Sequence, residues 1–168
     1  MIVSLDSPSP KDFPMSAEAR LSEMQLELPP APKPGGTYHP ILIVGNLAIV
    51  SGHGPLRSDG TMITGKVGDT MNETDAYQAA RQVGLTMLAT LRSELGTLDR
   101  IERLVKTFGM VNSTSDFGNH PQVINGFSNL MVEIWGETRG KGARSAVGMG
   151  SLPANIAVEV EAIFELIV

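Results

Sequence analysis

The sequence contains no cysteine, and this absence removes several kinds of chemistry. Without thiols the chain forms no disulfide, offers no thiolate to a metal ion and has no cysteine nucleophile. Histidine is also scarce, because only His39, His53 and His120 occur, and they form neither an HxH nor an HExxH pattern. We therefore do not expect a metal enzyme.

Dense basic runs and long apolar runs are missing as well. The chain carries 13 Lys and Arg against 18 Asp and Glu, a formal net charge of −5, whereas a nucleic-acid surface needs clustered positive charge. No apolar segment approaches the roughly 20 residues that span a bilayer, and residues 1–6 lack the basic and apolar start of a signal peptide. The glycine-rich residues 52–68 contain no phosphate-binding motif. We expect no cofactor, no nucleic-acid or membrane partner, and a cytoplasmic location.

What the sequence does contain is enough for one domain, with 168 residues of which 42% are hydrophobic. Residues 1–37 are predicted to form an N-terminal extension, in which Ser16 caps a helix over residues 17–26 and the prolines and glycines of residues 29–36 end it. The apolar spacing of this helix favours packing on the domain, and docking to a partner is the alternative. The domain proper is predicted to span residues 38–168.

The hydrophobic pattern and the turn residues predict the order of the elements in this domain. We expect strands over 38–44 and 47–51, an edge strand near 61–64, a helix over 73–95 ended by Gly96, a strand over 101–111, a helix over 121–135 ended by Gly136, and two final strands. The main order is ββαβαββ. A mostly antiparallel sheet with two helices on one face is the α+β solution for such an order.

The C-terminal quarter carries the candidate chemistry. Even positions over residues 156–168 are apolar, and the odd positions include Glu159, Glu161 and Glu165. Arg144 stands shortly before the Leu-Pro turn at 152–153, so glutamates on a return strand would bring a proton-handling acid near a carboxylate-binding cation. This pattern indicates a small acidic substrate. The alternative is that these are ordinary solvent-facing charges of an antiparallel sheet.

Several motifs together resemble one protein family. They are Arg-Ser-Ala-Val at 144–147, Leu-Pro at 152–153 and Val-Glu-Val-Glu-Ala at 158–162, joined upstream by Tyr38, Gly45-Asn46, Ser51-Gly52, Pro55 and Asn125. With these residues the chain resembles the Rid family of reactive intermediate deaminases, also called YjgF-like or L-PSP endoribonuclease-like proteins. The resemblance implies a chorismate-mutase-like fold assembled as a homotrimer with clefts between subunits. A sheet covered by helices on one side leaves its other side for neighbouring subunits, which agrees with this expectation.

The resemblance also implies the residues of the site. Arg144 takes the position of the family's carboxylate-binding arginine, which grips a carboxylate through two parallel hydrogen bonds. Glu159 takes the position of the glutamate that directs water, and Tyr38 and Asn125 match polar residues of the pocket. The backbone amide of Ala146 is a further expected donor. For Tyr38 the alternative is simple packing, and for Glu161, two residues on, we expect an exposed or interface charge.

Two departures from the family pattern affect the expected mechanism. Ala146 stands where many members have cysteine, so no thiol contributes here. His53 stands where the common pattern has glutamine, and it replaces or assists Glu159 in proton transfer unless it is a loop histidine without function. The expected activity is metal-free hydrolysis of an enamine or imine such as 2-aminoacrylate to a 2-keto acid and ammonia. A non-catalytic trimer that binds small carboxylates is the alternative, and RNA cleavage conflicts with the acidic composition.

Overall fold

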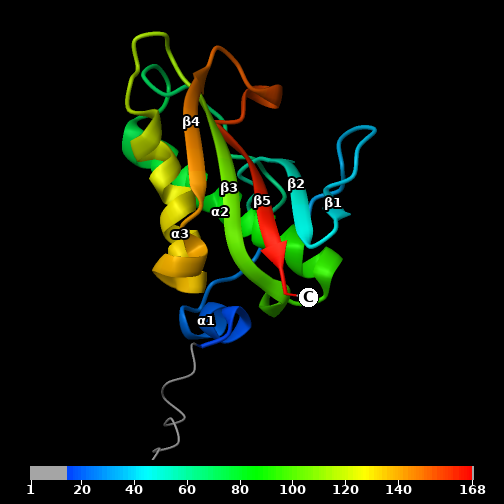
Figure 1. Ribbon diagram of the computed structural model, residues 1–168. Coiled ribbons are helices and arrows are strands. Elements are labelled where there is room, and N and C mark those ends of the chain that lie inside the picture. Colours follow the sequence, from blue (N-terminus) through cyan, green and yellow to red (C-terminus); the bar gives the residue numbers. More distant parts are fainter. Residues whose placement is uncertain (1–14, 168) are drawn as a thin grey trace, which may run out of the picture.

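The computed structural model of the protein describes residues 15–167. Residues 1–14 and Val168, where the start of the expected extension and the end of the C-terminal alternation fall, lie outside the described residues. The elements are α1 (Ala17–Glu23), β1 (Ile41–Val44), β2 (Leu47–His53), α2 (Glu73–Leu95), β3 (Ile101–Asn112), α3 (His120–Gly140), β4 (Ala143–Met149) and β5 (Val158–Leu166), as Figure 1 shows. The predicted ββαβαββ order follows α1, and the α+β class is confirmed.

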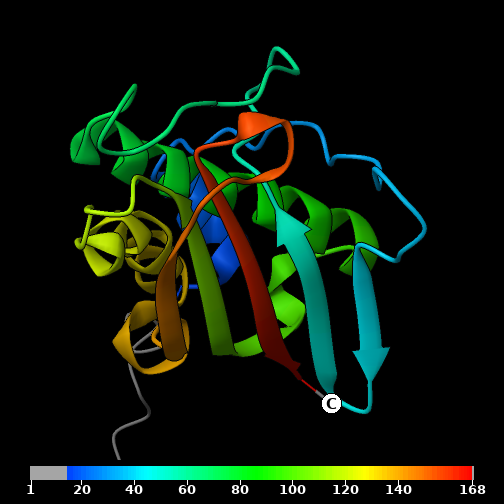
Figure 2. The same ribbon diagram turned by 90° about the horizontal axis from the view of Figure 1, so that it is seen from above.

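The five strands form one mixed sheet in the order β1-β2-β5-β3-β4 (Figure 2). Three of the four strand pairs are antiparallel, and β3 and β4 are parallel. The expectation that β5 returns antiparallel beside β4 after the Leu-Pro turn is therefore wrong, because β3 lies between β4 and β5. The crossover through α3 returns the chain parallel to β3, and the turn over residues 150–157 then passes the end of β3 before β5 begins.

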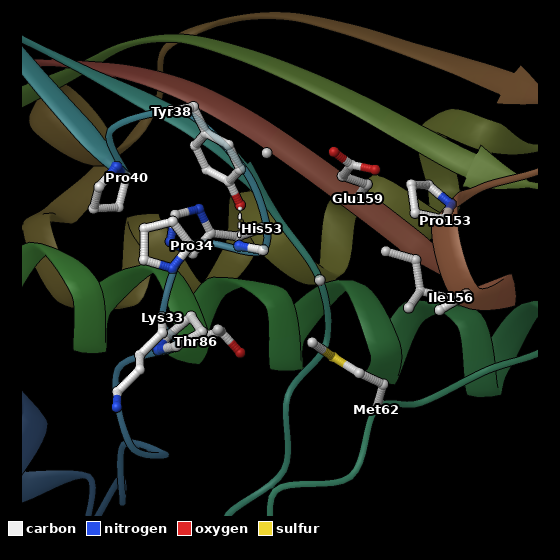
Figure 3. Close-up of a pocket in the computed structure, with 15 residues that line it drawn as sticks. Lys33, Pro34, Tyr38, Pro40, His53, Met62, Thr86, Pro153, Ile156 and Glu159 are labelled. Atoms are coloured by element: carbon white, nitrogen blue, oxygen red, sulfur yellow. Dashed lines mark hydrogen bonds between the residues drawn. The ribbon is translucent and has the colours of Figure 1, made fainter.

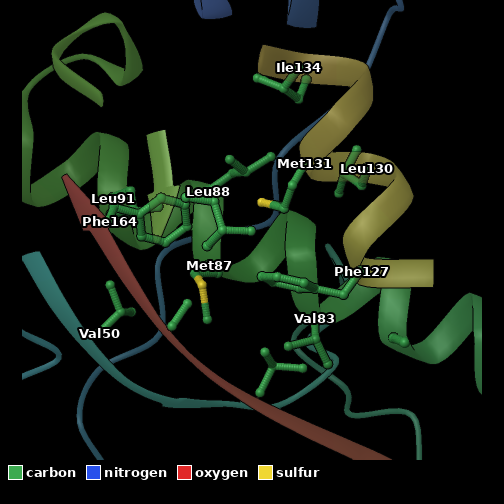
Figure 4. Packing of buried hydrophobic residues seen from close by; sticks show 14 of the residues in the cluster. Val50, Val83, Met87, Leu88, Leu91, Phe127, Leu130, Met131, Ile134 and Phe164 are labelled. Carbon is green, nitrogen blue, oxygen red and sulfur yellow. The ribbon is translucent and has the colours of Figure 1, made fainter. Parts of the chain in front are cut away.

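Helices α2 and α3 lie on one face of the sheet, and no described helix lies on the other (Figure 2). Apolar residues spaced along both helices pack with those of β2 and β5 into the main core, and Figure 4 shows Val50, Val83, Met87, Leu88, Leu91, Phe127, Leu130, Met131, Ile134 and Phe164. The two helices approach closely because Gly126 of α3 has no side chain. A Cβ there would press against the carbonyl oxygen of Tyr77 on α2.

Several boundaries differ from those expected. Gly136 has φ 77° and ψ 170°, so it interrupts α3 as the sequence suggested, but the helical path resumes as far as Gly140. The region near residues 61–64 forms only isolated bridges, Leu56 with Met62 and Thr64 with Ile156. Positive φ angles at Gly60 and Gly65 bend the chain there and prevent a continuous strand. The first strand begins at Ile41, so Tyr38 precedes it.

The helix of the N-terminal extension is part of the core. Ala17 and Leu21 of α1 are buried in the main cluster, as their spacing predicted. Glu18 fixes the helix further, because its carboxylate accepts hydrogen bonds from Arg92, with Oε2 2.5 Å from Nη2, and from the backbone N–H of Leu98 at 3.0 Å. The helix is shorter than expected and ends at Glu23. The division of the chain at residue 37 stays a prediction.

Candidate functional site

Glu159 lies on the face of β5 that the helices do not cover. Its side chain fits there because Gly52, on the neighbouring β2, leaves the space open, since a Cβ at Gly52 would lie against Oε1 and 3.0 Å from Cδ of Glu159. Burial raises the pKa of the Glu159 carboxyl above its usual value, and the charge of Glu161 raises it further. A carboxyl group with a raised pKa is suited to exchanging a proton with water or substrate.

A cavity of about 310 Å³ opens beside Glu159 (Figure 3). Its walls come from Tyr38, from Pro153 and Ile156 before β5, and from the proline-rich linker that includes Pro34. The hydroxyl of Tyr38 accepts a hydrogen bond of 3.2 Å from the backbone N–H of Gly35, so the linker and the tyrosine hold each other. The sequence identified Tyr38 and Glu159 but treated the linker only as a connection.

His53 also contacts this cavity, but its ring is held from within the domain. Nδ1 lies 2.7 Å from the carbonyl oxygen of Ser51, which only accepts, so Nδ1 carries the proton in this bond. Nε2 lies 2.8 Å from the hydroxyl of Thr90 and, in the neutral ring, accepts its proton. Burial lowers the pKa of His53, and the Ser51 bond opposes this shift. The geometry favours a structural role for His53 and leaves Glu159 as the group available for proton transfer.

Arg144 lies in a different place, on the edge strand β4 beside α3. Its Nη1 donates to Oδ1 of Asn125 at 2.8 Å and to the hydroxyl of Ser128 at 3.1 Å. Asn125 is itself oriented by Gln122, whose Oε1 accepts from Nδ2 of Asn125 at 2.9 Å. Arg144, Asn125 and Ser128 line a second cavity of about 310 Å³. Sequence reasoning missed Ser128, although its position three residues after Asn125 places it on the same helix face.

The Arg144 guanidinium keeps its charge without a carboxylate partner. Within residues 15–167 no ion pair includes Arg144, and its two side-chain partners are neutral. Burial lowers the pKa of Arg144 from its usual value. A partly buried cation of this kind favours an incoming anion. Ala146, two residues along β4, lies on the same face of the strand and packs against the core without a polar side chain.

Within one chain, Arg144 and Glu159 do not meet. Arg144 pairs across the sheet with Thr107, which is buried on the helix side, and Glu159 pairs with Met110, three residues further along β3. Because side chains alternate along a strand and paired residues share a face, these two groups lie on opposite faces. The chain thus brings Tyr38 and Glu159 together at one cavity and Arg144 and Asn125 together at another.

Among the described residues, no three His, Asp or Glu side chains gather in a way that would hold a metal ion. No helix in the same part of the chain is long and apolar enough to cross a bilayer.

Comparison with known proteins gives close relatives of this architecture. Protein TCP17 of Trypanosoma cruzi is 37% identical over 148 residues, which cover 88% of this chain and 92% of that protein. The crystal structure of Atu1372 from Agrobacterium tumefaciens, a protein of unknown function, is 40% identical, with a TM-score of 0.81 over 90% of this chain and 94% of that one. RidA from an Antarctic Psychrobacter is 26% identical, with a TM-score of 0.56 over 81% of this chain and 94% of that one.

Residues 18–166 also match the family described as YjgF/chorismate mutase-like, putative endoribonuclease. The match includes α1 and the proline-rich linker, and the mixed five-stranded sheet with its helices fits the chorismate-mutase-like fold of that family. The chain therefore belongs to the YjgF/chorismate mutase-like family.

Proposed function

We propose that the protein hydrolyses small enamines or imines that carry a carboxylate, in clefts shared between the subunits of a homotrimer in the cytoplasm. The observation that carries this proposal is the Arg144 guanidinium, which is partly buried and, among residues 15–167, forms side-chain hydrogen bonds only with the neutral Asn125 and Ser128. Such a group is ready to bind a carboxylate through two parallel hydrogen bonds. The similarity to a RidA protein supports the same reaction class.

The exposed face of the sheet supports an assembly of several subunits. Leu42, Val44 and Ile49 are 53%, 55% and 41% exposed and lie together on β1 and β2. Ile163 continues this row on β5, and a smaller cluster around Met110 adjoins it. An apolar sheet face without a helix over it is typical of a surface that neighbouring subunits cover. In such a trimer, the Glu159 cavity of one subunit would face the Arg144 cavity of the next.

The proposed reaction needs only positioning and one proton-transfer group. Arg144 holds the substrate carboxylate while Glu159 of the neighbouring subunit takes a proton from water, whose oxygen adds to the imine carbon. The imine nitrogen receives that proton, which gives a carbinolamine. The hydroxyl proton of the carbinolamine then moves to the nitrogen, the C–N bond breaks, ammonia leaves and the carbonyl group of the keto acid forms. The Tyr38 hydroxyl and the amide of Asn125 stabilise this tetrahedral intermediate by hydrogen bonds, together with the backbone N–H of Ala146.

A coupled assay tests this function. A dehydratase generates 2-aminoacrylate from serine, and the appearance of pyruvate is followed with the wild-type protein, Arg144→Lys and Glu159→Gln. Loss of the proton-transfer group in Glu159→Gln lowers the catalysed rate by about 100-fold or more. Arg144→Lys keeps the charge but not the planar fork, so we expect a higher KM with this variant. Arg20→Lys on α1 is the matched control and retains the wild-type rate.

Calorimetry beside the coupled assay distinguishes catalysis from binding alone. If calorimetry shows saturable binding of pyruvate that Arg144→Ala abolishes, but the wild-type protein never accelerates pyruvate formation, the protein is a carboxylate-binding trimer and the deaminase proposal is wrong. RNA cleavage by a nuclease-free preparation would contradict it in a different way. We expect no cleavage, because the net charge of −5 disfavours binding to a phosphate backbone.

A further inference from the structure

A third cavity, of about 600 Å³, lies at the C-terminal ends of β3 and β4. It shares no lining residue with the cavities of Glu159 and Arg144. The segment that follows β3 supplies Ser113, Thr114 and Ser115, the start of α3 supplies His120, and Lys66 reaches in from the loop before α2. The function proposed above uses none of these residues.

The polar groups of this cavity are mostly hydrogen-bond donors. Nζ of Lys66 donates one of its three protons to the carbonyl oxygen of Gly150, at 2.6 Å, and the other two can be donated to another partner. Nε2 of His120 lies 3.1 Å from the hydroxyl of Ser113, so these two groups already share one polar corner. Among the described residues no carboxylate belongs to the lining itself, but the exposed Asp116, next to Ser115 in sequence, interacts with the side chain of Thr114, and this contact lowers the pKa of the Asp116 carboxyl. Lys66 is the one lysine, arginine or carboxylate side chain of the lining, and its ammonium group offers an incoming anion a positive charge.

The backbone makes room for this arrangement. An added Cβ at Gly148 would press against Nε2 of His120 and lie 2.8 Å from the hydroxyl oxygen of Ser113. The ring of His120 also packs edge-on against Phe117, with centroids 5.3 Å apart and an interplanar angle of 86°. Gly148 and Phe117 thus fix the imidazole beside the serine, and the two side chains form a preset corner of the cavity.

We propose that this cavity binds the phosphate group of a small phosphorylated metabolite. The ammonium group of Lys66, the imidazole of His120 and the hydroxyls of Ser113 and Ser115 together match the several acceptor oxygens of a phosphate better than the two oxygens of a carboxylate. Lysine serves well as a point charge for phosphate. The volume suits a small molecule, and Phe117 and Met149 offer apolar surface to the part of the metabolite beyond the phosphate. This binding is independent of the proposed deamination.

Calorimetric titration of the full chain with inorganic phosphate tests the proposal. We expect saturable binding, weakened about tenfold or more by Lys66→Gln and by His120→Gln, because each substitution removes a donor to a charged acceptor. Lys141→Gln, which removes an exposed lysine elsewhere, is the matched control and retains the wild-type dissociation constant. Arg144→Ala also retains it, since the two cavities are separate.

Three results would overturn the assignment. The first is that the wild-type protein shows no saturable binding up to about 10 mM phosphate, a concentration that detects even weak binding of a small ligand. The second is a loss of affinity in Lys141→Gln equal to that in Lys66→Gln, and the third is a loss of affinity in Arg144→Ala. Pyruvate that binds in competition with phosphate and with equal affinity would also contradict the preference for phosphate. Gly148→Ala gives a second readout, because its methyl group enters the Ser113 and His120 corner and abolishes binding while Lys66 remains.

Discussion

At the scale of single residues, Glu159 shows how a carboxyl group is adapted by its surroundings. Both causes of its raised pKa lie on the same strand or next to it: partial burial beside Gly52, and the charge of Glu161. Removing the second cause alone, with Glu161→Gln, lowers the pKa of Glu159 toward its usual value. If ionised Glu159 is the base, the acidic limb of the profile of kcat/KM against pH moves to lower pH in this variant.

The control for this measurement is Glu94→Gln, which removes the same charge from an exposed position on α2. Its pH profile is expected to coincide with that of the wild-type protein. A limb that stays in place in Glu161→Gln, or that moves equally in both variants, would show that the group titrating in the rate is not Glu159 beside Glu161.

The raised pKa of Glu159 also makes the stability of the protein depend on pH. A carboxyl group whose pKa is higher in the folded than in the unfolded chain binds more protons when the chain is folded. Its ionisation therefore lowers stability as pH rises from the pKa of the unfolded chain, about 4.3, through the pKa of the folded chain. Glu159→Gln removes that cost. Urea unfolding at pH 7.5 is therefore expected to find this variant at least as stable as the wild-type protein, and a clear loss of stability would contradict the burial argument.

His53 changes stability with pH in the opposite direction to Glu159. Its pKa is lowered by burial, so between the folded value and the unfolded value of about 6.5 the unfolded chain binds more protons. The stability that His53 contributes is present above pH 6.5 and is lost as pH falls through that range. His53→Ala removes the ring from the Ser51 carbonyl and leaves the Thr90 hydroxyl with its long 3.4 Å hydrogen bond to the Thr86 carbonyl, and we expect it to lower the free energy of unfolding by about 1–3 kcal/mol at pH 7.5.

Urea unfolding at pH 7.5 and 5.5 measures this effect, with the exposed His39→Ala as the control. The difference between the wild-type protein and His53→Ala shrinks at pH 5.5. An equal difference at both values of pH would mean that His53 is not the buried neutral base its contacts indicate.

At the scale of helices and strands, the packing of α1 on the domain can be tested by substitution. Leu21 is 2% exposed and packs into the main core. Leu21→Ala is expected to lower the free energy of unfolding by about 2–4 kcal/mol, because it leaves a cavity between α1 and the domain. Ser22→Ala, on the exposed side of the same helix, changes it little. Thermal or urea unfolding distinguishes the two, and equal effects would indicate a helix that does not pack on the domain.

The elements also show what sequence patterns can and cannot predict. Strand and helix order followed from the alternation in β5 and from the glycines after α2 and within α3, because these signals are local. The strand that pairs with β4 could not be predicted from local signals, because the pairing of β4 with β3 depends on the crossover through α3 and not on the turn at residues 150–157. Arg144 and Glu159 were thus recognised as residues, but their placement on opposite faces required the three-dimensional register.

At the scale of the whole molecule, those opposite faces have a direct consequence. One chain supplies Glu159 with Tyr38 at one cavity and Arg144 with Asn125 at another. A site that uses both groups therefore needs two copies of the chain, and the exposed apolar face of the sheet gives these copies a reason to associate. In the proposed trimer, activity would belong to the interface between subunits and not to a single subunit.

A mixing experiment tests this consequence. Arg144→Ala keeps Glu159, and Glu159→Gln keeps Arg144, so a cleft between one copy of each contains both intact groups. If the two inactive variants are produced together in equal amounts and mix at random in a trimer, about a quarter of the clefts pair an intact Glu159 with an intact Arg144, and the sample regains about a quarter of the wild-type rate. Mass spectrometry of the intact assembly verifies that mixed trimers form. Mixed trimers without activity would show that each active site is built within one chain, and the arrangement proposed for Arg144 and Glu159 would be wrong.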